Sequence, residues 1–252
     1  MASKKMFNSR FKPYPSNGNG KKDSPIPEKS QAKAYECHDR TECVLRHIWP
    51  INKGGTKHVV LAADPEFNFK PTLVIRKPGF VGVKLNPGAT ERFLGTFTCI
   101  NEHFNSPVRE PSHIKSIQFG QREIGELGVH YNHKSLYIRT QSGLGESVNL
   151  LVNHHTWKFL YSVQPLLLHV FNHLNAISEE INYMYMALKD VVAEKFNLDQ
   201  ALDLNQLEEY LTALRSEEVP FAPSSEVSNV DYVRLFHELK RFCMYTFVNN
   251  DK

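Results

Sequence analysis

The chain has 252 residues, of which 41% are hydrophobic and 23% are charged, and its formal net charge is +3. These proportions are ordinary for a globular protein, and the length suffices for one large core or two small ones. No stretch approaches the ~20 consecutive apolar residues of a membrane-spanning helix, so we expect no membrane partner.

Residues 1–36 are predicted to be a disordered basic arm. Positions 1–33 hold eight Lys and Arg and two acidic residues, a net charge of +6, which leaves −3 on the rest of the chain. This segment is rich in Pro, Gly, Asn and Ser and cannot build a core. It suits a polyanion such as nucleic acid, or it serves only as a solubilising tail. Because it lacks the apolar core of a secretory signal, we expect an intracellular location, with the nucleus as one option.

The four cysteines are too few and too scattered for a disulfide scaffold. Cys37, His38, Cys43 and His47 place four potential zinc ligands close together. Their spacing differs from the paired Cys and His spacing of closed zinc sites. We therefore expect neither a metal nor a cofactor.

The first half of the chain is predicted to form four strands and a helix. The strands are expected at 41–49, 57–63, 72–76 and 80–85, separated by turn-forming residues. Pro87 lies where the helix begins, a position that tolerates its missing N–H, and the helix is expected to reach about Phe104.

The second half repeats this order. Strands are expected at 114–122, 128–132, 134–140 and 147–152, followed by a helix from about 153 to 177. Pro165 marks a kink or a boundary in that helix.

The two halves are related by an internal repeat. Val-Lys-Leu at 83–85 matches Val-Asn-Leu at 148–150, and Thr-Glu-Arg-Phe-Leu at 90–94 matches Thr-Trp-Lys-Phe-Leu at 156–160. Such a repeat indicates a duplicated supersecondary unit. We therefore predict an α+β fold in which residues 37–176 form two tandem β-β-β-β-α units with antiparallel sheets, at about 41–105 and 113–176.

Residues 177–252 are predicted to be a helical C-terminal region, with helices at about 178–195, 204–214 and 230–247. The last helix has an apolar stripe that either packs on the chain's own core or forms an oligomerisation or partner surface. That stripe consists of Val233, Phe236, Leu239, Phe242 and Phe247.

Alternation of apolar and polar residues assigns faces to the predicted strands. Leu136, Ile138 and Val152 are expected beneath the helix of the second unit, whereas Tyr137 and Arg139 point to the opposite face. One face of each sheet should therefore be polar, with aromatic and cationic side chains, and a ligand is expected there.

The order of elements resembles the Whirly family of single-stranded DNA-binding proteins, and each unit alone resembles the homodimeric coactivator called positive cofactor four. The resemblance covers about residues 41–176. Its nearest part is Glu-Ser-Val-Asn-Leu-Leu-Val at 146–152 followed by Thr-Trp-Lys-Phe-Leu at 156–160. It implies that two units pack helix against helix, that their sheets radiate outward, and that single-stranded DNA, or guide RNA in trypanosomal relatives, lies across the sheets with little sequence preference.

On this basis the predicted function is single-stranded nucleic-acid binding, with DNA favoured over RNA, in replication, transcription or genome packaging. Bases stack on aromatic rings, and nearby cations neutralise phosphates. The predicted contacts are Tyr137 and Phe80 for stacking, Arg76, Lys84, Arg122 and Arg139 for phosphates, and His130 for hydrogen bonding or stacking. The alternative interpretation is that these exposed side chains take part only in cross-strand pairing.

The two alternatives to nucleic-acid binding are an enzyme and an assembly protein. No nucleophile elbow, phosphate loop, zinc-protease pair or carboxylate dyad occurs in a suitable context, so an enzyme is not expected. The alternative is an assembly or scaffold protein, viral or cellular, in which the basic arm packages a polyanion and the sheets hold no ligand. In either case we expect a homo-oligomer formed through helices.

Overall fold

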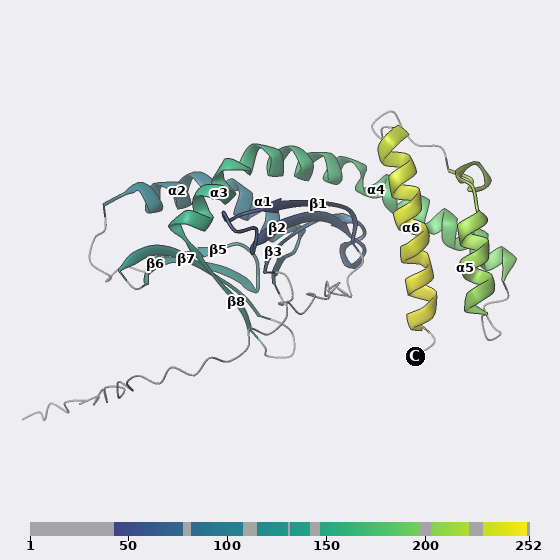
Figure 1. Cartoon of the computed structure of the whole chain (residues 1–252), viewed down its shortest axis with the longest axis horizontal. Coiled ribbons are helices and arrows are strands. Elements are labelled where there is room, and N and C mark those ends of the chain that lie inside the picture. The colour runs from purple at the N-terminus through teal and green to yellow at the C-terminus, as the bar shows by residue number, and fades with distance from the viewer. Residues whose placement is uncertain are drawn as a thin grey trace, which may run out of the picture. The chain divides into compact units, whose positions relative to one another are not determined.

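The structure is a computed structural model that describes residues 43–77, 82–107, 115–130, 132–141, 147–196, 203–221 and 229–250. Residues 37–252 belong to one compact unit. Figure 1 shows its helices and strands.

The first sheet is antiparallel and four-stranded, in the order β1-β2-β3-β4. Its strands are β1 (Val44–Pro50), β2 (His58–Asp64), β3 (Lys70–Arg76) and β4 (Val83–Leu85), with a short 3-10 turn η1 (Pro65–Phe67) between β2 and β3. The second sheet is also antiparallel, in the order β5-β6-β7-β8. Its strands are β5 (Lys115–Gln118), β6 (Glu123–His130), β7 (His133–Gln141) and β8 (Ser147–Asn153). The predicted α+β fold with two four-stranded units is confirmed.

The strand expected at 114–122 is shorter than predicted, because the chain turns after Gln118. The backbone N–H groups of Phe119 and Gly120 both donate to the carbonyl of Glu123, at 2.9 and 3.1 Å. The Glu123 carboxylate accepts a hydrogen bond of 2.7 Å from the Asn86 side chain. This partly buried contact joins the turn to the first unit.

Each unit ends in two helices where one was predicted. They are α1 (Pro87–Gly95) and α2 (Phe97–Asn105) in the first unit, and α3 (His154–Ser162) and α4 (Gln164–Lys195) in the second. In both units a hydroxyl at the break donates back to a phenylalanine carbonyl: Thr96 to Phe93 at 2.8 Å, and Ser162 to Phe159 at 2.7 Å. The duplication therefore includes the helix break. Pro165 stands at the start of α4 and does not kink it.

The helix starts are duplicated as well. The Asn86 side chain accepts from the N–H of Ala89, and the Asn153 side chain accepts from the N–H of Thr156, both at 2.9 Å. Asn is a favoured helix-capping residue because its side chain satisfies an otherwise unpaired N–H group. The same type of cap therefore begins the helix after β4 and the helix after β8.

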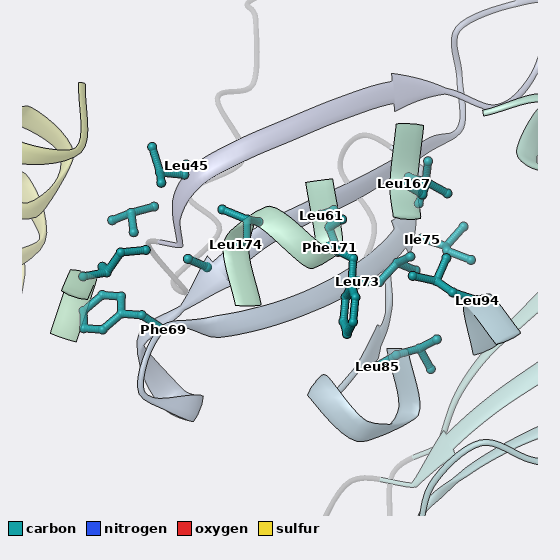
Figure 2. Close-up of a cluster of buried hydrophobic side chains, with 14 of the residues drawn as sticks. Leu45, Leu61, Phe69, Leu73, Ile75, Leu85, Leu94, Leu167, Phe171 and Leu174 are labelled. Carbon is teal, nitrogen blue, oxygen red and sulfur yellow. The ribbon is translucent and has the colours of Figure 1, made fainter. Parts of the chain in front are cut away.

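The helix that follows the second unit packs on the first sheet. Helix α4 packs over β2 and β3, and Leu167, Phe171 and Leu174 belong to the buried cluster on that side of the sheet (Figure 2). Conversely, α2 of the first unit contacts β7 and α3 of the second. The two units thus share one hydrophobic core. The helix expected at 178–195 is the continuation of α4, which runs without interruption through positions 176 and 177.

The C-terminal helices α5 (Leu204–Ala213) and α6 (Asn229–Asn250) follow, with a short 3-10 turn η2 (Ser216–Glu218) between them. Helix α6 contacts β1, α4 and α5. Phe236, Leu239 and Phe242 are buried, whereas Val233 is 57% exposed. Most of the predicted apolar stripe therefore packs on the chain's own core. No helix of the described residues is long and apolar enough to cross a membrane.

Candidate nucleic-acid interface

The strand register gives the second sheet one helix-covered face and one open face. Leu136 of β7 pairs with Val152 of β8, and both side chains are buried beneath the helices. Tyr137 and Arg139, whose side chains alternate with these, are partly exposed on the opposite side. The face assignment made from the alternation is therefore correct for β7.

The open face carries an aromatic and cationic cluster of His130, Tyr137 and Arg139. The ring of His130 stacks on that of Tyr137, with 6.2 Å between centroids and an interplanar angle of 28°. The Arg139 guanidinium lies 5.9 Å from the same ring centroid. Nδ1 of His130 is 2.6 Å from the Ser135 hydroxyl, which orients the imidazole. Three of the seven predicted site residues are thus brought together.

Two neighbours in this cluster were not predicted. Glu126 of β6 lies opposite Tyr137 and forms an ion pair with Arg139. Leu151 of β8 lies opposite Tyr137 on the other side and is 36% exposed. The missing signal was the register, since β6 was expected to start only at Gly128. The β6–β7 register places Glu126 on the open face, and the β7–β8 register places Leu151 there.

The Arg139–Glu126 ion pair leaves the guanidinium able to contact a ligand. The Arg139 side chain is 43% exposed and that of Glu126 is 25% exposed, and a partly exposed pair of this kind contributes only about 1 kcal/mol. A guanidinium has five N–H donors, and one carboxylate does not use them all. A phosphate can therefore compete with Glu126 for the Arg139 guanidinium, although the negative charge of the carboxylate repels the phosphate.

Lys84 has a different environment from the one predicted. Its ammonium lies 2.6 Å from Asp64, which is fully buried, and 2.7 Å from Glu66. Burial alone disfavours the ammonium, but hydrogen bonds to these two carboxylates outweigh it, so the pKa of Lys84 is raised. The Asp64 carboxylate also accepts from the Thr72 hydroxyl at 3.0 Å. Lys84 therefore stabilises the fold, and its two carboxylate partners compete with a phosphate for its ammonium group.

The other predicted contacts lie apart from the cluster. Arg76 is at the end of β3 in the first sheet, and Arg122 is exposed in the turn before β6. Phe80 falls outside the described residues, as do Cys37 and His38 of the cysteine–histidine group considered for zinc. Within the described ranges, no group of three His, Cys, Asp or Glu residues is arranged to hold a metal ion.

The chain was also compared with known proteins. No protein-family model matches it, and no curated protein or solved structure is significantly similar to it.

Proposed function

We propose that this protein binds single-stranded nucleic acid, DNA in preference to RNA, with little dependence on sequence. The observation that carries the proposal is the ring of Tyr137, which lies on the open face of the second sheet between His130 and Arg139. A base stacked on such a ring contributes about 1–3 kcal/mol, whatever the base. The neighbouring guanidinium supplies a salt-dependent phosphate contact.

The architecture supports the same proposal at a coarser level. Two four-stranded antiparallel sheets, each followed by helices that cross to the other unit, are what a Whirly-like arrangement requires. The exposed Leu151 beside Tyr137 adds an apolar surface against which a base can rest. The basic segment 1–33 adds sequence-independent attraction to a polyanion. We propose that the protein acts by binding alone, without catalysis.

The test is fluorescence anisotropy with labelled single-stranded DNA, single-stranded RNA and duplex DNA over a series of salt concentrations. Tyr137→Ala should weaken single-strand binding about tenfold, the equivalent of roughly 1.4 kcal/mol. Tyr137→Phe keeps the ring and should bind like the wild type. Tyr183→Ala, which removes an aromatic side chain that is 66% exposed on α4, is the matched control. Equal affinity of Tyr137→Ala and Tyr183→Ala for single strands would contradict the proposal.

A second candidate function, assembly or scaffolding, is favoured by exposed apolar side chains on α3 and the start of α4. Phe159, Tyr161, Leu166 and Leu168 are each more than a third exposed. We propose that a second copy of the chain covers them. Sedimentation velocity of Leu166→Asp should then show a smaller species than the wild type. An oligomer that does not bind single strands would put this function first.

A further inference from the structure

A groove separates the end of the first sheet from the edge of the second. It has a volume of about 420 Å³, within the range of small-ligand clefts. On one side it is lined by Lys57, which precedes β2, and by Arg76 and Lys77 at the end of β3. On the other side lie Asn149 and Leu151 of the edge strand β8.

The groove brings three cations together. Lys57 is half-buried and its Nζ donates to the Leu151 carbonyl at 3.5 Å, across the boundary between the two sheets. Burial lowers the pKa of Lys57, and the charge of Lys77 lowers it further. An anion bound in the groove would be attracted by the charges of these side chains. Among the described residues that line the groove, none is acidic.

The close approach of backbone and side chain at Gly82 helps to shape this groove. A Cβ atom at Gly82 would meet the Arg76 Cβ at 2.5 Å and the Ile75 carbonyl oxygen at 2.7 Å. Real Cβ atoms do not approach so closely, so only glycine allows the chain to pass beside Arg76 at this point. The position of Arg76 in the groove therefore depends on Gly82.

The groove is continuous with the open face of the second sheet. Asn149 pairs with Arg139, and Leu151 pairs with Tyr137, so these two groove residues are cross-strand neighbours of cluster residues. Adjacent strands lie about 4.8 Å apart. A strand of nucleic acid with a base on Tyr137 therefore needs only to cross β8 for its backbone to reach the three cations.

We propose that the groove binds phosphate groups of the same nucleic-acid strand whose bases stack on Tyr137. The inference rests on the proposed function and adds Lys57 and Lys77, with Arg76, as its phosphate contacts. The nucleic-acid strand then leaves the second sheet at the boundary between the two sheets and does not cross the face of the first sheet.

The inference can be tested separately from base stacking with inorganic tripolyphosphate, which has phosphates and no bases. Isothermal titration calorimetry would use the full chain, so that the basic arm contributes equally to every variant. The groove variant is Lys57→Ala with Lys77→Ala. The matched control is Lys158→Ala with Lys195→Ala, which removes two exposed lysines on α3 and α4. The groove variant should bind tripolyphosphate at least tenfold more weakly than the control, and Tyr137→Ala should bind it like the wild type.

The second readout is single-stranded DNA binding against salt. Loss of two phosphate contacts should reduce the slope of log K against log salt by about 1.4. The variant Lys57→Arg with Lys77→Arg keeps both charges and should restore tripolyphosphate binding. Thermal unfolding of each variant checks that the fold is intact.

The outcomes separate the two proposals. If the groove variant and the control bind tripolyphosphate equally and have the same salt slope, the groove inference is wrong. The proposed function then survives if Tyr137→Ala still weakens single-strand binding. If no variant, nor the wild type, binds single strands, the proposed function fails and the assignment of the groove to a nucleic-acid strand fails with it.

Discussion

The two sheets have the same strand order and the same helix caps, but they differ on the face turned away from the helices. In the first sheet, Val60 and Ala62 of β2 point away from the helix-covered side, yet they are only 5% and 3% exposed. In the second sheet, the face of β7 that is turned away from the helices carries Tyr137 and Arg139, which are partly exposed, as is Val74 of β3, the strand that corresponds to β7.

The difference between β2 and β7 bears on the proposed function. A strand that is buried on both faces supports the fold, and β2 reads accordingly as a nearly continuous apolar run. A sheet with one open face keeps alternation and can present polar side chains to a ligand. The comparison supports the proposal that the second sheet holds the nucleic-acid interface.

The largest expected effect concerns a charge placed on each of these faces. Val60→Asp should lower the free energy of unfolding by about 4 kcal/mol, because it buries a carboxylate without a partner. Leu151→Asp, on the open face of the second sheet, should lower it by less than about 1 kcal/mol. Chemical denaturation measures both. Similar losses in the two variants would remove the structural distinction between the sheets.

The next largest effect distinguishes Lys84 from Arg139, two of the four predicted phosphate contacts. Lys84→Met leaves the fully buried Asp64 carboxylate without its cation and should lower the free energy of unfolding by about 3 kcal/mol. Arg139→Met removes a partly exposed ion pair and should lower the free energy of unfolding by only about 1 kcal/mol, while it weakens single-strand binding. Denaturation and anisotropy on both variants check this. Weakened binding by a stable Lys84→Met protein would return Lys84 to the interface.

A smaller effect sharpens the description of the open face itself. Glu126→Gln removes the carboxylate that competes with phosphate for Arg139, so single-strand affinity should rise by up to about fivefold, the equivalent of roughly 1 kcal/mol. Glu179→Gln removes one exposed negative charge on α4 and serves as the control for net charge. If the two variants gain equally, the effect is due to overall charge and not to release of Arg139.

The smallest effect concerns the helix-covered side of the second sheet. His154 of α3 stacks on Phe104 with 5.7 Å between ring centroids. Burial, and then the charge of Lys158, lower its pKa below the ordinary value of 6.5. Because the unfolded chain takes up a proton that the folded chain does not, stability should fall as pH drops below about 6.5.

Denaturation between pH 7.5 and pH 5.5 should show this loss, and it should be smaller in His154→Gln, which cannot titrate. His155→Gln, an exposed neighbour on α3, is the control for removing a histidine. An unchanged pH dependence in His154→Gln would show that the ring is not held neutral by its surroundings.

Local signals located most of the secondary structure. Alternation identified β7 and β8 and their faces, and Pro87 identified the start of α1. Local signals failed where a distant residue decided the outcome. The turn before β6 includes a contact of Glu123 with Asn86 of the first unit, and the helix break at Thr96 follows no strong local signal, whereas Pro165 marked the boundary between α3 and α4.

The same division applies to the candidate site. Tyr137, Arg139 and His130 could be placed on one face because neighbouring positions in paired strands obey a period of two. Whether Lys84 is available depends on Asp64 and Glu66, which reach it only after β2 and β4 are assembled around β3. No periodicity in the strand that holds Lys84 carries that information.

By itself, the sequence determined the α+β class, the duplicated four-stranded units and the polar composition of the exposed face of β7, because these follow from repeats, turn residues and alternation along one strand. Only the tertiary structure decided that α2 and α4 cross to the opposite unit and that β2 is buried on both sides. It also decided that Lys57, Arg76 and Lys77 meet β8 in one groove. The physical reason is that burial and charge pairing depend on which elements meet in space, and residues far apart in the chain make those contacts.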